Sequence, residues 1–223
     1  MAAAIKLGKM WYIKHQELDI MKKERKKTED TAKDGIIQPQ PAFLINALDK
    51  VEMLSKEKPE VIPGMMQKIK NLLLYVVYEN NQSKVKLEKE LALLKEYIEL
   101  EQESSQEKIR MNIKLPQYLN GEKIAPFIIL PLVENSFHQL SLLDVADKFI
   151  NIEAKIYAGN FALNIAWSKP VDTSTLVNGS NAFLNTINKR LQLLYPQSHK
   201  LKVIIKPTLF VVDLKIYLDG AIN

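Results

Sequence analysis

Residues 131–138 read Pro-Leu-Val-Glu-Asn-Ser-Phe-His and follow an apolar run, Ile124–Leu130. The pattern predicts a helix whose polar pair, Glu134 and Asn135, lies in apolar surroundings. Burying such a pair costs free energy unless it has partners. One partner that suits these oxygen atoms is a hydrated divalent cation that carries phosphates. The alternative is a partly buried helix whose polar end is simply solvated.

Composition indicates an ordinary globular chain without cysteine chemistry. The 223 residues are 47% hydrophobic and 26% charged, which suits one large domain or two small ones. The absence of cysteine excludes disulfides, cysteine nucleophiles and cysteine-ligated zinc. The three histidines, His15, His138 and His199, are scattered, so the sequence indicates no dense metal cluster.

The charge pattern and the absence of long apolar runs limit the partners. The net charge of +5 is mild, and basic residues mostly alternate with acidic ones, so we do not expect nucleic-acid binding. No run reaches the ~18 apolar residues of a membrane-spanning helix. Met1–Met10 mixes alanines with two lysines, unlike a signal peptide. We expect a cytoplasmic location, with the inner face of the cell membrane as an option.

Residues 1–34 form a charged segment that contains a basic cluster at Lys22–Lys27. One interpretation is a solvated helix or arm, which is the common outcome for such a charge run. The other is a signalling helix that connects an upstream region, such as a membrane anchor, to the domain that follows. A basic start with an aromatic residue could also contact anionic lipid.

Residues 35–80 predict a pair of apolar helices. The first begins near Pro41, which suits a first helical turn, and the second runs from about Gly64 to Tyr78. Lys56–Pro63, with two prolines, is the expected turn between them. Two such helices form an antiparallel hairpin. The hairpin alone cannot bury all its leucine, methionine and valine side chains, so we expect a four-helix dimer core.

Residues 81–220 predict an α+β domain. A third helix runs from about Leu87 to Glu107, with Glu90 among the charged residues expected on its solvent side. The period then changes from helical to alternating. Strands are expected in pairs at 149–156 and 161–167, with a turn at 158–160, and at 201–206 and 209–218, with a helix at 181–195 before the second pair. This order predicts a mixed or antiparallel sheet with helices on one face.

Five blocks in this order resemble a sensor histidine kinase of the LytS-like family. They are Gln40–Asn46, Leu87–Glu101, Pro131–Asn135, Ser168–Pro170 and Asn185–Pro196. Each block is weak alone, but together they span roughly residues 35–218. The resemblance implies a dimerisation hairpin over residues 35–80 and a GHKL (Bergerat-type) α/β sandwich over residues 81–220, preceded by the charged linker.

The phospho-acceptor position of the family is not a histidine here. The family places histidine after Asn-Pro in the first block, and this chain has Ala42. A methyl group has no lone pair and cannot attack a phosphoryl group. Asn46 lies one helical turn later and would neighbour that histidine without replacing it.

The nucleotide motifs also depart from the family. The acidic or amide pair that reads adenine is replaced by Ala166 and Trp167. The glycine-rich lid is replaced by Ser-Asn-Ala-Phe-Leu-Asn at 180–185, which lacks the glycines that let backbone N–H groups approach phosphates. His138 stands where a permanent cation is common, so less positive charge faces phosphate at neutral pH.

The resemblance makes Asn135 the magnesium ligand and Glu134 a water-activating or water-orienting carboxylate. If Mg-ATP binds, His138, Ser168 and Asn185 are the further candidate contacts. The alternative for each is a structural role that satisfies the backbone.

The resemblance implies a two-component signalling protein that forms a homodimer, or a heterodimer with an active kinase, and binds a response regulator. Without an acceptor, the expected form is a pseudokinase that lacks autophosphorylation. The alternative is an active histidine kinase or ATPase with a non-standard acceptor.

Overall fold

The computed structural model describes residues 42–79, 82–105, 109–143, 147–169 and 174–218. Side chains are described from Phe43 onward and, in the last helix, from Phe183 onward. All of these described residues belong to one compact unit. The charged segment 1–34 lies outside the described residues, so both interpretations of it stay predictions.

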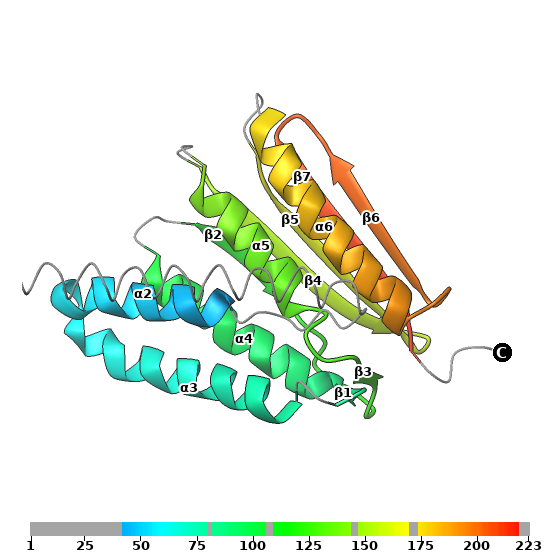
Figure 1. Ribbon diagram of the computed structural model, residues 1–223, viewed down its shortest axis with the longest axis horizontal. Helices are drawn as coiled ribbons and strands as arrows, with labels where there is room; N and C mark the ends of the chain where they lie inside the picture. The colour runs from blue at the N-terminus through cyan, green and yellow to red at the C-terminus, as the bar shows by residue number, and fades with distance from the viewer. Residues whose placement is uncertain (1–41, 80–81, 106–108, 144–146, 170–173, 219–223) are drawn as a thin grey trace, which may run out of the picture. The chain divides into compact units, whose positions relative to one another are not determined.

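The predicted hairpin is present. Helix α2 covers Ala42–Glu57, a short 3-10 turn covers Pro59–Val61, and helix α3 covers Ile62–Glu79 (Figure 1). The proline at the start of the 3-10 turn cannot continue the preceding helix, which explains the break. The two helices pack through buried residues at i, i+3 and i+4 spacing, among them Phe43, Leu54, Met65, Ile69 and Leu72.

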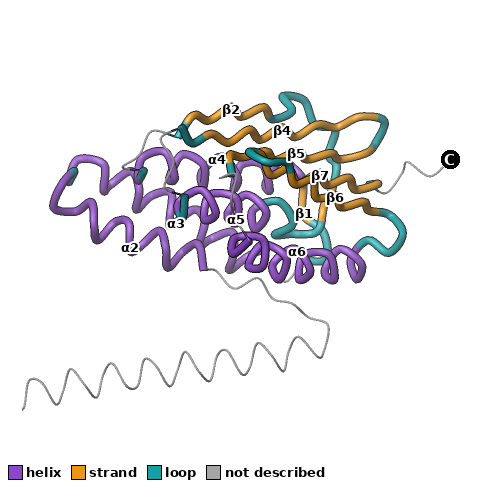
Figure 2. Tube along the Cα trace, turned by 90° about the horizontal axis from the view of Figure 1, so that it is seen from above, coloured by secondary structure: helices purple, strands orange, loops and turns teal. Residues whose placement is uncertain are grey.

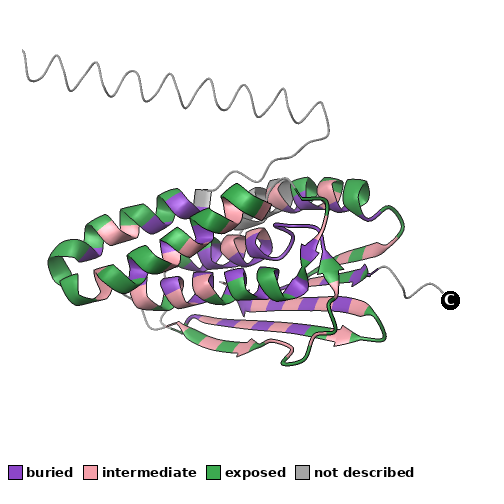
Figure 3. Ribbon diagram, turned by 90° about the horizontal axis from the view of Figure 1, so that it is seen from below, coloured by how far each residue is buried: buried purple, intermediate pink, exposed green. Residues whose placement is uncertain are grey.

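An apolar surface remains uncovered on this hairpin. Its side chains are 42 to 68% exposed, and we call them the hairpin stripe: Ile45, Leu48, Met53, Met66, Leu73, Leu74, Val77 and Tyr78. Figure 3 shows exposed residues along both helices. Single exposed apolar residues are ordinary, and here eight of them lie on the two helices of one hairpin.

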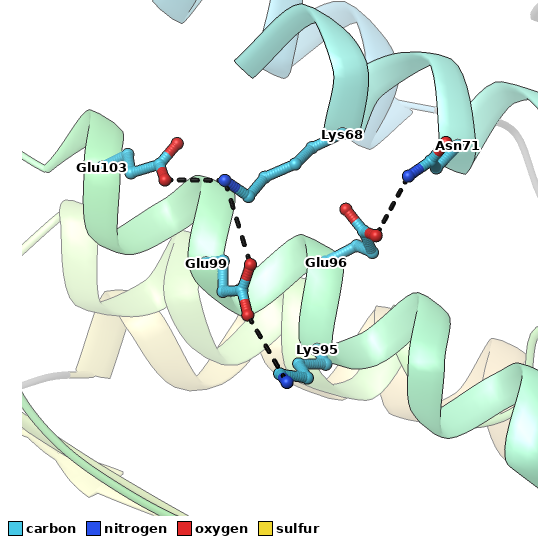
Figure 4. A network of polar contacts seen from close by, with 6 residues as sticks. All are labelled: Lys68, Asn71, Lys95, Glu96, Glu99 and Glu103. Atoms are coloured by element: carbon cyan, nitrogen blue, oxygen red, sulfur yellow. Dashed lines mark hydrogen bonds and ion pairs between the residues drawn. The ribbon is translucent and has the colours of Figure 1, made fainter. Parts of the chain in front are cut away.

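Helix α4, Leu87–Ser104, packs against α3 through both apolar and charged residues. Lys68 of α3 reaches Glu103 at 2.6 Å and Glu99 at 3.8 Å, and Asn71 donates to Glu96 at 3.0 Å (Figure 4). Glu90 was predicted on the solvent side and is fully buried instead. It follows Leu87 by three positions, so helical geometry places both on one face.

The second half is the predicted α+β arrangement with a mixed sheet. Five strands lie in the order β2-β4-β5-β7-β6. Strand β2 is parallel to β4, and the other neighbours are antiparallel. Their bounds are β2 Arg110–Lys114, β4 Phe149–Tyr157, β5 Asn160–Ser168, β6 His199–Ile205 and β7 Leu209–Tyr217. Figure 2 shows the helices on one side of the sheet, which confirms the predicted fold class.

The alternating pattern along the strands gives the core. On β5, Phe161, Leu163, Ile165 and Trp167 are all buried, while the residues between them are partly exposed. Ala158 and Gly159 both have positive φ, 48° and 73°, which is the backbone of the tight turn predicted between β4 and β5.

Three features were not predicted. Helix α6 covers Ser174–Leu194, so it begins within the segment predicted as a loop, and the stretch 180–185 compared with the lid is helical. Two short strands, β1 at Val85–Lys86 and β3 at Lys123–Ile124, pair antiparallel. Helix α5, Leu130–Ser141, was predicted, but the tight loop before it was not.

Strand β6 forms one edge of the sheet and carries exposed apolar side chains. Val203, Ile204 and Ile205 are 38%, 41% and 46% exposed. The exposed Lys200 and Lys202 stand beside them. Charged residues on an edge strand hinder pairing with another chain.

Candidate functional site

Helix α5 carries the Glu-Asn pair, and the loop before it is strongly bent. Pro131 stands in the first helical turn, where its missing N–H has no cost. No side chain of the cap residue Ile129 satisfies the first backbone N–H groups. Phe127 has a φ of 55°, an uncommon left-handed backbone for an aromatic residue. Such a loop needs support from neighbouring elements.

Glu90 of α4 supplies much of that support. Its Oε1 atom accepts hydrogen bonds from the Phe127 N–H at 2.8 Å and from the Tyr75 hydroxyl, and its Oε2 accepts from the Ile129 N–H at 3.4 Å. Burial raises the pKa of Glu90, while the Tyr75 and backbone donors act in the opposite direction. Glu90 therefore satisfies backbone N–H groups of the bent loop that leads into α5.

Arg190 of α6 and Tyr195, the residue after that helix, also hold this loop. Arg190 donates to the carbonyl oxygens of Pro126 and Phe127 at 2.8 and 3.1 Å. The Tyr195 hydroxyl accepts a hydrogen bond from the Ala125 N–H at 2.6 Å. Burial lowers the pKa of Arg190, and the charge of Glu90 opposes that shift.

We call Glu90, Arg190, Tyr195 and the loop 125–129 the α5 clamp. Sequence reasoning missed it, although one signal was available: Glu90 lies at helical spacing between Leu87 and Leu94.

Glu134 faces the helical half of the molecule. Burial raises its pKa to about 7, the carboxylate of Glu101 on α4 adds to the rise, and Lys50 on α2 opposes it. Lys50 itself contacts the Glu101 carboxylate at 2.6 Å. The ammonium group of Lys50 therefore pairs with Glu101, and its charge also acts on Glu134. A carboxyl group with a pKa near neutrality can act as a proton acceptor or donor.

Aromatic contacts join the start of α2 to α5. Tyr97 of α4 lies edge-on to Phe43 of α2, with ring centroids 6.3 Å apart, and edge-on to Phe137 of α5 at 6.0 Å. Ala42, at the position predicted to correspond to the phospho-acceptor, is the first residue of α2 and precedes Phe43. Asn46, one turn later, is exposed.

The remaining candidates lie on three elements, α5, β5 and α6. Asn135 is partly buried on α5, and His138 is exposed one turn later on the same helix. Ser168 is buried at the end of β5, where its Oγ accepts the Phe149 N–H at 3.2 Å. Asn185 is exposed on α6. The structure thus places Glu134, Asn135 and His138 on α5, where the charges of Glu101 and Lys50 act on Glu134, whereas Ser168 and Asn185 lie on β5 and α6.

Two of the candidate contacts for a magnesium nucleotide already interact with other groups. Glu134 faces Glu101 and Lys50, and Ser168 already serves the backbone of β4. The helical stretch at 180–185 lacks the open backbone N–H groups of a glycine-rich lid. Within the described ranges, no three His, Cys, Asp or Glu side chains gather into a metal site. The fit to Mg-ATP is therefore partial.

Comparison with known proteins shows which proteins this chain resembles. A family model described as "Histidine kinase" matches residues 37–109, which cover α2, α3 and α4. The sensor histidine kinase BtsS of Escherichia coli K12 is 24% identical over 172 residues, 76% of this chain. Over these regions the chain is similar to sensor histidine kinases. The sensor protein kinase HptS of Staphylococcus aureus USA300 is 24% identical over 113 residues, 51% of this chain.

The chain spans less than a third of the length of each of these two proteins. The aligned regions cover 30% of BtsS and 22% of HptS. Among solved structures, the histidine kinase domain of the Erythrobacter litoralis EL346 blue-light activated histidine kinase aligns with a TM-score of 0.49 at 12% identity, over 89% of this chain and 97% of that one. In the part of the chain that the structure describes, no helix has the length and apolar content to cross a bilayer.

Proposed function

We propose that this chain is a two-component signalling protein that does not phosphorylate itself and acts through dimerisation and response-regulator binding. The observation that carries the proposal is Ala42. It occupies the acceptor position of the histidine-kinase block and begins helix α2. Phosphoryl transfer to a side chain needs a nucleophile, and alanine provides none.

The hairpin stripe supports the dimerisation part of the proposal. Its apolar side chains lie on both helices of a hairpin, and a second hairpin would cover them as a four-helix bundle. The partner is a second copy of this chain or the equivalent hairpin of an active kinase. A C2-symmetric contact between equal stripes would be self-complementary.

The nucleotide side supports reduced or absent catalysis. Trp167, at the position where the family reads adenine, is buried in the core against Phe210, with ring centroids 4.6 Å apart. An indole N–H donates and does not accept, so it cannot replace a carboxylate. The helical stretch at 180–185 points the same way.

One observation favours a second candidate, an active kinase or ATPase with a non-standard acceptor. Glu134 has its pKa raised to about 7, as a general base working at neutral pH would. Asn135 beside it would then hold magnesium. In that case the alanine at position 42 requires acceptance by another residue or by water.

Calorimetric titration with Mg-ATP and a radiolabel assay together test the proposal. The wild type is compared with Asn135→Ala in both. No incorporation of ³²P from labelled ATP supports the pseudokinase. Binding heat that Asn135→Ala abolishes would show that nucleotide still acts as a ligand without transfer. Incorporation of label into the wild type would overturn the proposal in favour of the enzyme.

Response-regulator binding is tested separately with a panel of purified receiver domains. A saturable complex with one of them, seen by surface plasmon resonance, supports that part of the proposal. The same proposal places the chain in the cytoplasm, where an upstream membrane-anchored region would bring it to the inner face of the membrane.

A further inference from the structure

Tyr75 lies on a turn of α3 that also carries part of the hairpin stripe. Leu73, Leu74 and Val77 of that turn are 48%, 42% and 59% exposed. Tyr75 between them points inward, where its hydroxyl donates to Glu90 and its ring lies edge-on to Phe127 at 5.1 Å. One helical turn therefore presents an apolar outer surface and a polar inner contact.

The inner contact of Tyr75 is with the Glu90 carboxyl group, which also holds the loop of the α5 clamp. The Tyr75 hydroxyl and the Phe127 N–H both donate to the same oxygen, Oε1 of Glu90. Glu90 is fully buried, so a donor that leaves it is not replaced by water. A change in the position of Tyr75 therefore changes the balance of hydrogen bonds that fixes the bent loop before α5.

We propose that Tyr75 is a positioning residue through which the hairpin sets the loop 125–129, and with it the placement of Glu134 and Asn135 on α5. The link runs from α3 through Glu90 on α4 to the start of α5. The regulatory meaning of the link rests on the proposed dimer, because packing on the hairpin stripe would then bias the clamp. If dimerisation changes the affinity of the α5 clamp for a ligand, that ligand changes the dimerisation constant by the same factor.

The charges of Arg190 and Glu79 act on the two residues of this link. Arg190 of α6 lies close enough to Glu90 for their charges to interact, and Glu79 of α3 acts on Tyr75. Burial raises the pKa of the Tyr75 hydroxyl, with Glu90 adding to the rise, so the hydroxyl keeps its proton and remains a donor. The link does not depend on titration at neutral pH.

Hydrogen exchange with mass spectrometry tests the link in the whole chain. Tyr75→Phe removes the hydroxyl and keeps the ring, and Tyr118→Phe, at an 86% exposed position outside the hairpin stripe, is the matched control. We expect Tyr75→Phe to speed exchange of the amides of 127–133 at least tenfold, with no change in β5 and β7. Tyr118→Phe should leave both regions as in the wild type. A purely global loss of stability would speed exchange in β5 and β7 as well, and this result would overturn the proposal.

A second comparison separates this inference from the proposed function. Exchange of 127–133 is measured above and below the concentration at which the dimer dissociates. A difference in the wild type that shrinks in Tyr75→Phe supports the link to the hairpin. No difference in a protein that does dissociate overturns it. A chain that stays monomeric removes the dimer from the proposed function but leaves the Tyr75→Phe comparison valid, because Tyr75 and Glu90 belong to one chain.

Discussion

Glu134 makes the stability of the fold depend on pH. Its pKa of about 7 in the folded state lies above its ordinary value of 4.5, so between these values the folded state binds more protons than the unfolded state. Stability from this residue is therefore fully present below pH 4.5 and falls as the pH rises to 7. We expect Glu134→Gln to lose this dependence and to be more stable than the wild type at pH 8 by on the order of 1–3 kcal/mol.

Urea unfolding at pH 5 and pH 8 measures this difference. Glu88→Gln is the control, because Glu88 is an exposed carboxylate of α4. The control should follow the wild type at both pH values. Equal pH dependence in the wild type and in Glu134→Gln would show that the carboxyl group is not held in its protonated form.

Restoring the acceptor histidine should not restore catalysis. We expect Ala42→His to incorporate no label from ATP, because the lid stretch is helical and Trp167 occupies the core. The measurement is ³²P incorporation over hours, with Asn46→His as a control that places the imidazole one turn away. Label on Ala42→His alone would mean that the nucleotide site works and that position 42 was the sole defect.

Single residues were the hardest part to predict. Glu134 and Asn135 were recognised because a polar pair interrupts an apolar run. Glu90 was assigned to the solvent side because it is charged, although its spacing from Leu87 placed it on the buried face. Its partners are backbone N–H groups 37 and 39 residues away, and no sequence pattern marks backbone groups as partners.

Among the elements, the hairpin makes the sharpest prediction. Val77→Glu places a charge in the hairpin stripe, and burying it in a dimer would cost at least about 1.4 kcal/mol, a tenfold weaker association. Val203→Glu makes the same change on the edge strand β6. We expect sedimentation equilibrium to show weaker dimers only for Val77→Glu. Equal dissociation constants for both variants would remove the hairpin stripe from the interface.

Element existence followed from periodicity, and element ends did not. The apolar spacing of α2, α3 and α5 and the alternation along β4 and β5 predicted each of these elements. The start of α6 was missed because Ser174–Ser180 contains serine, threonine, asparagine and glycine, which favour loops. Propensities of this size are small and readily overridden by tertiary context.

At the scale of the whole molecule, the α5 clamp connects helices α4 and α6 through the loop before α5. Arg190→Ala would leave the carbonyl oxygens of Pro126 and Phe127 without this donor and the buried charge of Glu90 less balanced. We expect a loss of about 2–4 kcal/mol in the free energy of unfolding. Chemical denaturation measures it, with the exposed neighbour Lys189→Ala as control. A loss below 0.5 kcal/mol would mean that water replaces the guanidinium.

The arrangement of the sheet shows where sequence reasoning stops. Alternation predicted which side chains face the core, but the sequence left a mixed or an antiparallel sheet equally open. The parallel pairing of β2 with β4 joins residues nearly forty positions apart, as in the pair Arg110 and Phe149. Such pairings are set by how α5 crosses the sheet, and local patterns do not encode that crossing. The predicted boundary at residue 80 stays a prediction.

Strand β6 has a consequence for handling the protein in solution. We expect the lysines beside its apolar edge at Val203–Ile205 to repel another copy of the strand and so to hinder edge pairing. Added salt screens that repulsion over a distance of about 3 Å at 1 M, compared with about 10 Å at 0.1 M. Concentrated stocks should therefore stay clear longer in dilute buffer than in high-salt buffer, and light scattering over days would reveal the difference.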